Sequence, residues 1–466
     1  MMNCLFTKRI SSLLLAGASI FLLQAGYSQE SGTDLKAVLP SESHINWADA
    51  EIGVIIHYDI NVFAPETFDY KNNATLPDLK IFNPSKLDTD QWLEAAKAAG
   101  AKYAVLVAKH GTGFTLWPSK ANNYNVGNTP WKNGKGDIVA DFIKSCKKYD
   151  IKPGFYYNTN YNTYYGAGYR PFDSPEKLRE YNAIVLQQLT ELWTRYGSLM
   201  EIWFDGGVMV NEKGGIAAEV EQLIQKHQPQ AILFQGPVKN KNLIRWVGNE
   251  DGRAPYPHWS RTDATASSDG VIEIKDLHGN PNGKLWSPAE ADFPNRKKSA
   301  WNGGWLWHAD QEQYIFSAEE LLDRYYTSVG RNANMLIGMV IDTAGRFPPE
   351  DYKQFVAFGK EIKRRFSKPL AETHGKGGEI LLTIPGRPTG INHIVIMEDI
   401  SKGERVRKYV VEAWIDNKWK PVCDGISIGH KRIHQFDTIT TNKIRLNITV
   451  YSGAPQVKML SAYHVQ

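Results

Sequence analysis

Length, composition and charge limit what this chain can be. Its 466 residues allow two to four domains at roughly 100–200 residues each, which excludes a single small domain. Hydrophobic residues make up 42% and charged residues 22%, which is typical of globular proteins and excludes a disordered or collagen-like chain. The net charge is only +4, and no basic run or zinc-finger spacing accompanies it, so we expect no nucleic-acid partner.

The N-terminus, residues 1–28, has the pattern of a secretory signal peptide. Lys8 and Arg9 precede an apolar stretch at residues 10–23, and small or polar residues follow through Ser28. The stretch is shorter than the ~20 residues that a membrane-spanning helix needs. We therefore expect cleavage near Ser28, a secreted or periplasmic protein, and no membrane insertion after cleavage.

From about residue 52, short apolar runs alternate with longer amphipathic ones. The apolar runs predict strands at residues 52–57, 102–108, 151–157, 199–204, 231–234, 243–247, 285–287 and 334–340. Apolar residues at three- and four-residue spacing predict helices between them, at residues 90–99, 138–148, 175–196, 216–227 and 318–328. Repeated β-α units predict a (β/α)8 TIM-like barrel. An open doubly wound sheet is the alternative, although no glycine-rich phosphate fingerprint follows the first strand.

The pattern changes after residue 367. Short alternating runs at residues 379–384, 393–397, 408–415 and 443–450 are separated by Gly, Pro, Asn and Asp. They predict a C-terminal all-β sandwich over residues 368–466. The barrel domain would then span residues 29–367, with a helix at residues 349–366 as the bridge between the two.

Polar residues follow the predicted barrel strands at the end where the active sites of such barrels lie. Trp117, Trp203 and Trp305 are close to them in sequence, and aromatic residues make up 12% of the chain. Because sugar rings stack on aromatic faces, we expect a polar pocket with aromatic walls that holds a carbohydrate. The polar residues are His57, Lys109, His110, Tyr157, Asn158, Asp205, Glu250 and Glu290.

Carboxylates in this pocket point to glycosidic cleavage, because one attacks or activates water while another protonates the leaving oxygen. Asp205 directly follows an apolar strand and precedes two glycines, and we predict it as one of the pair, with a helix N-cap as its alternative role. Glu250 is predicted as the other carboxylate of the pair, and Glu290, with Asp292 two residues on, competes for that role. Metal-binding histidine pairs, a Gly-x-Ser-x-Gly elbow and a phosphate-binding loop are all missing, so neither a metal nor a cofactor is expected.

An ordered series of motifs runs from about residue 45 to 365: Asn83-Pro84, Asp90-Gln91-Trp92, Lys109-His110, Leu116-Trp117-Pro118-Ser119, Trp203-Phe204-Asp205-Gly206 and Ser328-Val329-Gly330-Arg331-Asn332. In this series the sequence resembles the α-L-fucosidases of glycoside hydrolase family 29. The resemblance implies a retaining hydrolase in which Asp205 attacks the anomeric carbon and a glutamate acts as acid and then base. It also implies that His57, Glu66, His110 and Tyr157 bind fucose. Glu250 resembles the acid/base of the branch that removes α-1,3/1,4-linked fucose.

Three segments depart from the family's usual pattern. Residues 57–59 read His-Tyr-Asp in place of His-Trp-Gly or His-Phe-Gly, residues 109–114 read Lys-His-Gly-Thr-Gly-Phe in place of Lys-His-His-Asp-Gly-Phe, and residues 158–160 read Asn-Thr-Asn in place of Ser-Pro-Trp. Two alternatives therefore stay open: a glycan-binding protein on a decayed hydrolase barrel, and a hydrolase of a fucose-like galactoside. Because Asp205 and Glu250 are both present, catalysis on an oligosaccharide or glycoconjugate is favoured.

Overall fold

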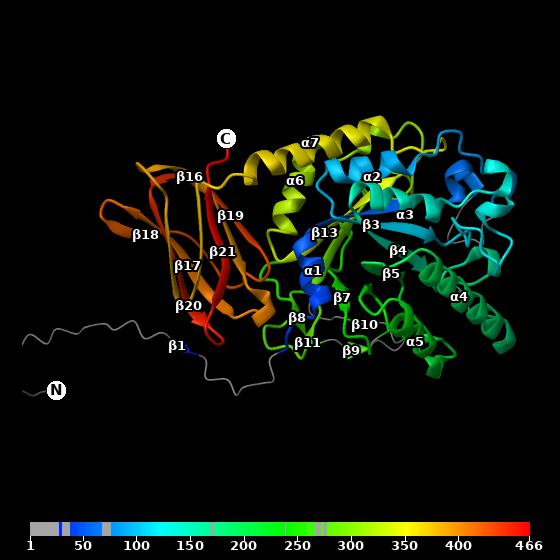
Figure 1. Ribbon diagram of the computed structural model, residues 1–466, viewed down its shortest axis with the longest axis horizontal. Helices are drawn as coiled ribbons and strands as arrows, with labels where there is room; N and C mark the ends of the chain where they lie inside the picture. The colour runs from blue at the N-terminus through cyan, green and yellow to red at the C-terminus, as the bar shows by residue number, and fades with distance from the viewer. Residues whose placement is uncertain are drawn as a thin grey trace, which may run out of the picture.

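The computed structural model describes residues 28–29, 38–67, 76–168, 172–237, 239–263, 265–266, 272–273 and 277–466. The predicted signal peptide lies outside the described residues except for Ser28. The chain forms two domains side by side, a helix-covered barrel and a β domain, with helix α7 running from one toward the other (Figure 1). Among the described residues, no helix is both long and apolar enough to cross a bilayer.

A closed barrel of parallel strands forms the first domain, as predicted. Neighbouring strands follow the order β12-β13-β2-β3-β4-β5-β6-β7, and closure excludes the open doubly wound sheet. Their inward side chains fill the barrel, and their outward side chains pack against the helices. The strands are β2 (Ile52–His57), β3 (Tyr103–Lys109), β4 (Lys152–Asn158), β5 (Glu201–Asp205), β6 (Ile232–Phe234), β7 (Leu243–Trp246), β12 (Ala289–Phe293) and β13 (Ala333–Val340).

The prediction for the seventh barrel strand was wrong. Leu285–Trp286 forms β11, which pairs with β8 (Arg261–Thr262) outside the barrel, and β9 (Thr265–Ala266) pairs with β10 (Ile272–Glu273) in the same way. The barrel strand is β12, in which two carboxylates alternate with Ala289, Ala291 and Phe293. These carboxylates interrupt the apolar run on which the prediction depended.

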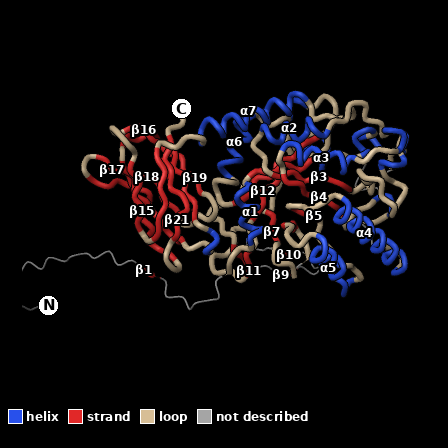
Figure 2. Tube along the Cα trace, in the orientation of Figure 1, coloured by secondary structure: helices blue, strands red, loops and turns tan. Residues whose placement is uncertain are grey.

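Helices cover the outside of the barrel (Figure 2). The five predicted helices between the strands are all present, and their apolar faces are buried against the sheet. The hydroxyl of Ser317 and the carboxylate of Glu320 form a capping box at the start of α6. The helices are α1 (Glu42–Ala50), α2 (Thr89–Ala98), α3 (Ile138–Tyr149), α4 (Pro175–Arg195), α5 (Ala217–His227), α6 (Ala318–Thr327) and α7 (Pro349–Phe366).

Two sheets pack face to face in the second domain and confirm the predicted sandwich. One sheet has the order β14-β21-β16-β19, and the other has the order β1-β20-β17-β18 with β15 also paired to β20. Inward residues such as Ile394, Val411 and Leu446 form its core. The strands are β1 (Ser28–Gln29), β14 (Ala371–Lys376), β15 (Glu379–Thr383), β16 (Thr389–Glu398), β17 (Val406–Ile415), β18 (Lys418–Gly425), β19 (Arg432–Thr441), β20 (Lys443–Tyr451) and β21 (Gln456–Tyr463).

The barrel and the sandwich share both apolar and polar buried contacts. Ile433 and Tyr463 of the sandwich belong to the hydrophobic core of the barrel. The buried carboxylate of Glu404 accepts hydrogen bonds from the backbone N–H of Ser260, at 2.9 and 3.0 Å, and from Asn332 Nδ2, at 2.7 Å. The sandwich therefore supplies the acceptor for the backbone N–H of Ser260 and the shortest of the hydrogen bonds that Asn332 Nδ2 donates.

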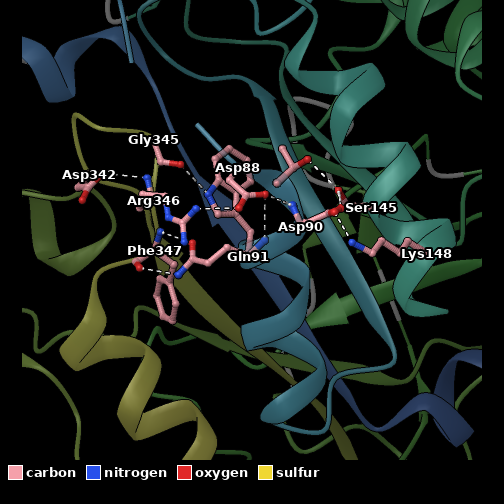
Figure 3. Close-up of polar contacts among 11 residues, drawn as sticks. Asp88, Asp90, Gln91, Ser145, Lys148, Asp342, Gly345, Arg346 and Phe347 are labelled. Carbon is pink, nitrogen blue, oxygen red and sulfur yellow. Dashed lines mark hydrogen bonds and ion pairs between the residues drawn. The ribbon is translucent and has the colours of Figure 1, made fainter. Parts of the chain in front are cut away.

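A polar network joins the start of α2 to the loop that follows β13, the last barrel strand (Figure 3). The carboxylate of Asp88 accepts from the backbone N–H of Asp90 at 3.0 Å and from Arg346 Nη1 at 2.7 Å. Trp92 Nε1 donates to the carbonyl of Gly345 at 3.0 Å. These contacts tie the helix after the first strand to the loop after the last one, where the barrel closes.

We expect Asp88→Ala to lower the free energy of unfolding by about 1–2 kcal/mol, because it removes an N-cap as well as the partner of Arg346. Urea unfolding followed by circular dichroism measures the change. Lys148→Ala is the matched control, since it removes an exposed ion pair with Asp90 that solvent screens, and it should leave the free energy of unfolding nearly unchanged. Equal effects of the two substitutions would contradict a role for Asp88 in closing the barrel.

Candidate active site

A cavity of about 240 Å³ opens at the carboxyl ends of the barrel strands. It brings together five of the residues predicted from the sequence: His57, His110, Trp203, Glu250 and Trp305. His57 is the last residue of β2, and Glu250 lies half-buried in the loop after β7. The other residues that line the cavity are Ile55, Tyr156, Asp292 and Asn302.

One wall of the cavity belongs to a ladder of stacked aromatic rings, formed by Phe234, Trp203, Tyr156 and His110. Ring centroids lie 3.8 Å apart between Phe234 and Trp203, 5.3 Å between Trp203 and Tyr156, and 5.7 Å between Tyr156 and His110, with interplanar angles of 5°, 18° and 23°. The stacking follows from strand register, because Tyr156 pairs with Trp203 across β4 and β5, and Trp203 pairs with Phe234 across β5 and β6. The wall is therefore rigid and offers ring faces and edges to a sugar.

Asp205 ends β5, and two donors hold its carboxylate. Tyr156 Oη donates to Oδ2 at 2.6 Å, and Asn158 Nδ2 donates to the same oxygen at 3.1 Å. Burial raises the pKa of Asp205, as does the charge of Glu250, while the bond from Tyr156 and the charge of Lys109 act in the opposite direction. Both donors contact Oδ2, so Oδ1 is free of these bonds. The N-cap alternative fails, because α5 is capped at Ile216.

The two histidines of the cavity are neutral near pH 7. Burial and the neighbouring His110 lower the pKa of His57 to about 3, and burial together with Lys109 lowers the pKa of His110 to about 4. Burial also lowers the pKa of Lys109 to about 7. A neutral imidazole has one N–H donor and one acceptor nitrogen, which suits the hydroxyl groups of a sugar.

Two of the departures from the family pattern touch each other next to His110. Asp59 is buried, and Thr112 Oγ1 donates to both of its carboxylate oxygens at 2.8 Å. Burial raises the pKa of Asp59 to about 7. His110 Nδ1 lies 3.9 Å from Asp59 Oδ2, and because the pKa of His110 is lowered to about 4, this contact is not an ion pair at neutral pH.

Three residues predicted to bind substrate lie outside the cavity. Tyr157 faces the helices, where its hydroxyl donates to Gln188 Oε1 at 2.6 Å. Trp117 is buried in the barrel's hydrophobic core, and its Nε1 donates to Glu191 Oε2 at 2.8 Å. Glu66 is exposed in a short helical turn next to residues outside the described ranges. Side chains alternate along a strand, so Tyr156 takes the inward position on β4 that Tyr157 cannot take.

Glu290 also lies outside the cavity, since it is buried inside β12 and does not follow a strand. It accepts from Tyr103 Oη at 2.7 Å and from Trp203 Nε1 at 3.0 Å. Burial raises the pKa of Glu290 to about 7, and burial together with the charge of Glu290 raises the pKa of Glu201 well above its usual range. Glu290 therefore supports Trp203 from below the cavity floor.

Asp292, two residues further along β12, is the carboxyl group of this strand that lines the cavity. Trp246 Nε1 donates to its Oδ1 at 2.5 Å, and burial and the charge of Glu290 raise its pKa well above the usual range. Asp292 was predicted only beside Glu290, as a competitor for the acid/base role, and the alternation of Glu290 and Asp292 with alanines is the signal that would have revealed an inward-facing pair. Among the described residues, no group of three or more His, Cys, Asp and Glu side chains could hold a metal ion.

Tyr156→Phe should lower kcat/KM for glycoside hydrolysis roughly 10-fold or more, because it removes a hydrogen bond to the ionised Asp205. That bond lowers the pKa of Asp205, so its loss raises the pKa and moves the acid limb of the pH profile to higher pH. Rates on an aryl glycoside from pH 4 to 8 provide the test. Tyr157→Phe is the matched control and should leave the acid limb in place. An acid limb that does not move in Tyr156→Phe would contradict the role of the Tyr156 hydrogen bond in setting the pKa of Asp205.

Comparison with known proteins places the chain in a family and supports its overall fold. The model of the α-L-fucosidase family matches residues 37–365. A crystal structure of a Bacteroides thetaiotaomicron protein assigned to the α-L-fucosidases is 38% identical, with a TM-score of 0.85, and the match covers 92% of this chain and 100% of that one. A structure of a glycoside hydrolase 29 family member from a rumen bacterium is 33% identical, with a TM-score of 0.78, over 92% and 78% of the two chains. Alpha-L-fucosidase 1 of Arabidopsis thaliana is 28% identical over 91% of this chain and 87% of its own length.

Proposed function

The chain belongs to the α-L-fucosidases of glycoside hydrolase family 29, and on that premise we propose that Asp205 is its nucleophile and Glu250 its acid/base. The reaction is the removal of fucose with retention of anomeric configuration. We propose terminal α-1,3- or α-1,4-linked L-fucose of an oligosaccharide or glycoconjugate as the substrate. Secretion or export to the periplasm completes the proposal and is supported by the leader pattern of residues 1–28.

The observation that carries the catalytic proposal is that Asp205 accepts a hydrogen bond from Tyr156, which lines the same cavity as Glu250. Asp205 Oδ1 attacks the anomeric carbon while Glu250 gives its proton to the departing glycosidic oxygen. The products of this step are a covalent fucosyl ester on Asp205 and the released alcohol. Glu250, now ionised, takes a proton from water, which attacks the same carbon and frees Asp205.

Sugar contacts would come from the neutral imidazoles of His57 and His110 and from the rings of Trp203 and Trp305. The two histidines donate and accept hydrogen bonds at any pH well above the lowered pKa values of both rings. His57 and Trp305 pack together with ring centroids 4.9 Å apart, which fixes the orientation of both. Apolar ring faces and polar ring nitrogens together match the two kinds of surface that a deoxy sugar presents.

The departures from the family pattern do not favour a decayed glycan-binding barrel. Asp59 and Thr112, which replace the usual residues, satisfy each other's hydrogen bonds, and Asn158 donates to the proposed nucleophile. A barrel that has lost its activity has no reason to keep a half-buried carboxylate at the end of β5 with two donors on one oxygen. The α-1,3/1,4 linkage is supported by the Gly-Asn-Glu-Asp-Gly segment around Glu250, which resembles the acid/base segment of that branch.

A panel of substrates tests the proposal. Nitrophenyl α-L-fucoside and fucosylated oligosaccharides with α-1,2, α-1,3, α-1,4 and α-1,6 linkages are incubated with the protein, beside nitrophenyl α- and β-galactosides. We expect release of α-L-fucose first, observed by NMR, with the α-1,3 and α-1,4 substrates cleaved fastest. Cleavage of galactosides alone would support the galactoside alternative. Binding of oligosaccharides without any release would support the glycan-binding alternative.

A further inference from the structure

Three consecutive side chains at the end of β4 donate hydrogen bonds to three consecutive residues at the end of β5. Asn158 Nδ2 donates to the carboxylate of Asp205 at 3.1 Å, Asn160 Nδ2 donates to the carbonyl of Gly206 at 2.6 Å, and Thr159 Oγ1 donates to the carbonyl of Gly207. We call residues 158–160 the clamp. These residues are the third departure from the family pattern, so their contacts are a property of this chain.

The segment that the clamp contacts, Gly206 and Gly207, has no side chains whose packing could fix its backbone. Gly206 and Gly207 have φ of +74° and +75°, in the left-handed region that glycine adopts without strain. Glycine has no side chain to pack and loses the most conformational freedom on folding. A Cβ added at Gly206 would lie 2.7 Å from Asn160 Nδ2, so the close approach of the clamp itself requires glycine there.

The clamp is fixed from its other side by buried groups. Lys109 Nζ donates to the carbonyl of Asn158 at 2.5 Å and to the carbonyl of Tyr161 at 2.6 Å. Tyr181 Oη, on α4, donates to the carbonyl of Thr159 at 2.8 Å. Both Lys109 and Tyr181 are buried or nearly so. The clamp therefore transmits the rigidity of β3 and α4 to the segment that follows Asp205.

We propose that Thr159 and Asn160 are positioning residues for the nucleophile, which hold the backbone of Gly206 and Gly207 so that Asp205 keeps its attack geometry. This inference rests on the proposed function of Asp205. Neither side chain touches the carboxylate, so neither contributes to its charge or its proton. Their contribution is geometric, and a misplacement of about 1 Å in a reacting group costs roughly 100-fold in rate. The expected loss therefore falls on kcat rather than on KM.

Thr159→Val removes the hydroxyl but keeps the shape of the side chain, and Thr159→Ser keeps the hydroxyl. With an aryl fucoside we expect Thr159→Val to lower kcat about 10- to 100-fold with KM within about twofold, and Thr159→Ser to recover most of the loss. Asn160→Ala, at a half-buried position, should show the same split between kcat and KM. Thr163→Val is the matched control, because Thr163 Oγ1 also donates to a glycine carbonyl, that of Gly111, on a different loop.

Thermal unfolding of each variant separates a loss of fold from a loss of geometry, and Asn160→Ala keeps the test open if Thr159→Val does not fold. Wild type and Asp205→Asn are measured in parallel. If wild type releases no fucose, or if Asp205→Asn stays active, the proposed function fails and the clamp is not at fault. If both behave as proposed while folded Thr159→Val and Asn160→Ala keep wild-type kcat, or lose no more than Thr163→Val, the positioning role is overturned.

Discussion

Asp205→Asn should lower kcat for fucoside hydrolysis by at least about a thousandfold, because the amide cannot form the covalent intermediate. The substitution is isosteric, and Tyr156 can still donate to the amide oxygen, so we expect thermal unfolding close to that of wild type. Steady-state and single-turnover rates on a nitrophenyl fucoside measure the loss. Fucose should still bind, since the histidines and tryptophans of the cavity are unchanged.

Chemical rescue gives this prediction its control. Azide added to Asp205→Gly should restore part of the activity by replacing the missing carboxylate, with a fucosyl azide of inverted configuration as the product. If Asp205→Asn keeps more than a tenth of wild-type activity, Asp205 is not the nucleophile. Rescue by azide in Glu250→Gly with formation of the β-azide would lead to the same conclusion.

Glu250→Gln should slow the hydrolysis of substrates with poor leaving groups by roughly 100- to 10,000-fold, because these depend on a proton for departure. The effect on a dinitrophenyl fucoside should be far smaller, since its leaving group needs no proton. Rates on a series of aryl fucosides against the pKa of the leaving phenol measure the difference. The slope of that plot should be steep for Glu250→Gln and shallow for wild type.

Two nearby carboxyl groups serve as controls for Glu250. Glu290→Gln should lower all rates alike, because Glu290 holds Trp203 and does not reach the cavity. Asp292→Asn tests the carboxyl group that does line the cavity. If the steep slope appears in Asp292→Asn or Glu290→Gln while Glu250→Gln retains a shallow one, the acid/base role belongs to that residue instead.

The barrel and the ends of its strands could be predicted from the sequence, because apolar runs mark strands and ligand-binding residues follow them. His57 and Asp205 lie where those runs end, and both are at the carboxyl end of the barrel. The sequence could not predict which side chains of β4 face the barrel interior, because an error of one residue in the strand exchanges the inward and outward positions. Tyr157 faces the helices and Tyr156 faces the cavity for this reason.

Two other predictions failed for one physical reason. Buried polar residues cannot be told from exposed ones in a sequence. β12 contains Glu290 and Asp292 on its inward face, and these carboxylates hid the strand. Asp59 and Thr112 looked like separate losses, whereas the fold brings them into contact across 53 residues of chain. A single sequence gives no signal for such a long-range pair, because each residue alone reads as an ordinary polar substitution.

The contacts of Glu404 with Ser260 and Asn332 make the sandwich an inseparable part of the molecule. We expect a chain cut after residue 367 to leave the backbone N–H of Ser260 without its acceptor and to expose the apolar surface that now meets Ile433 and Tyr463. The sandwich therefore differs from a detachable carbohydrate-binding module, which can be exchanged between enzymes by recombination. We therefore expect a barrel without the sandwich to fold only if the flank around Ser260 and Asn332 is rebuilt.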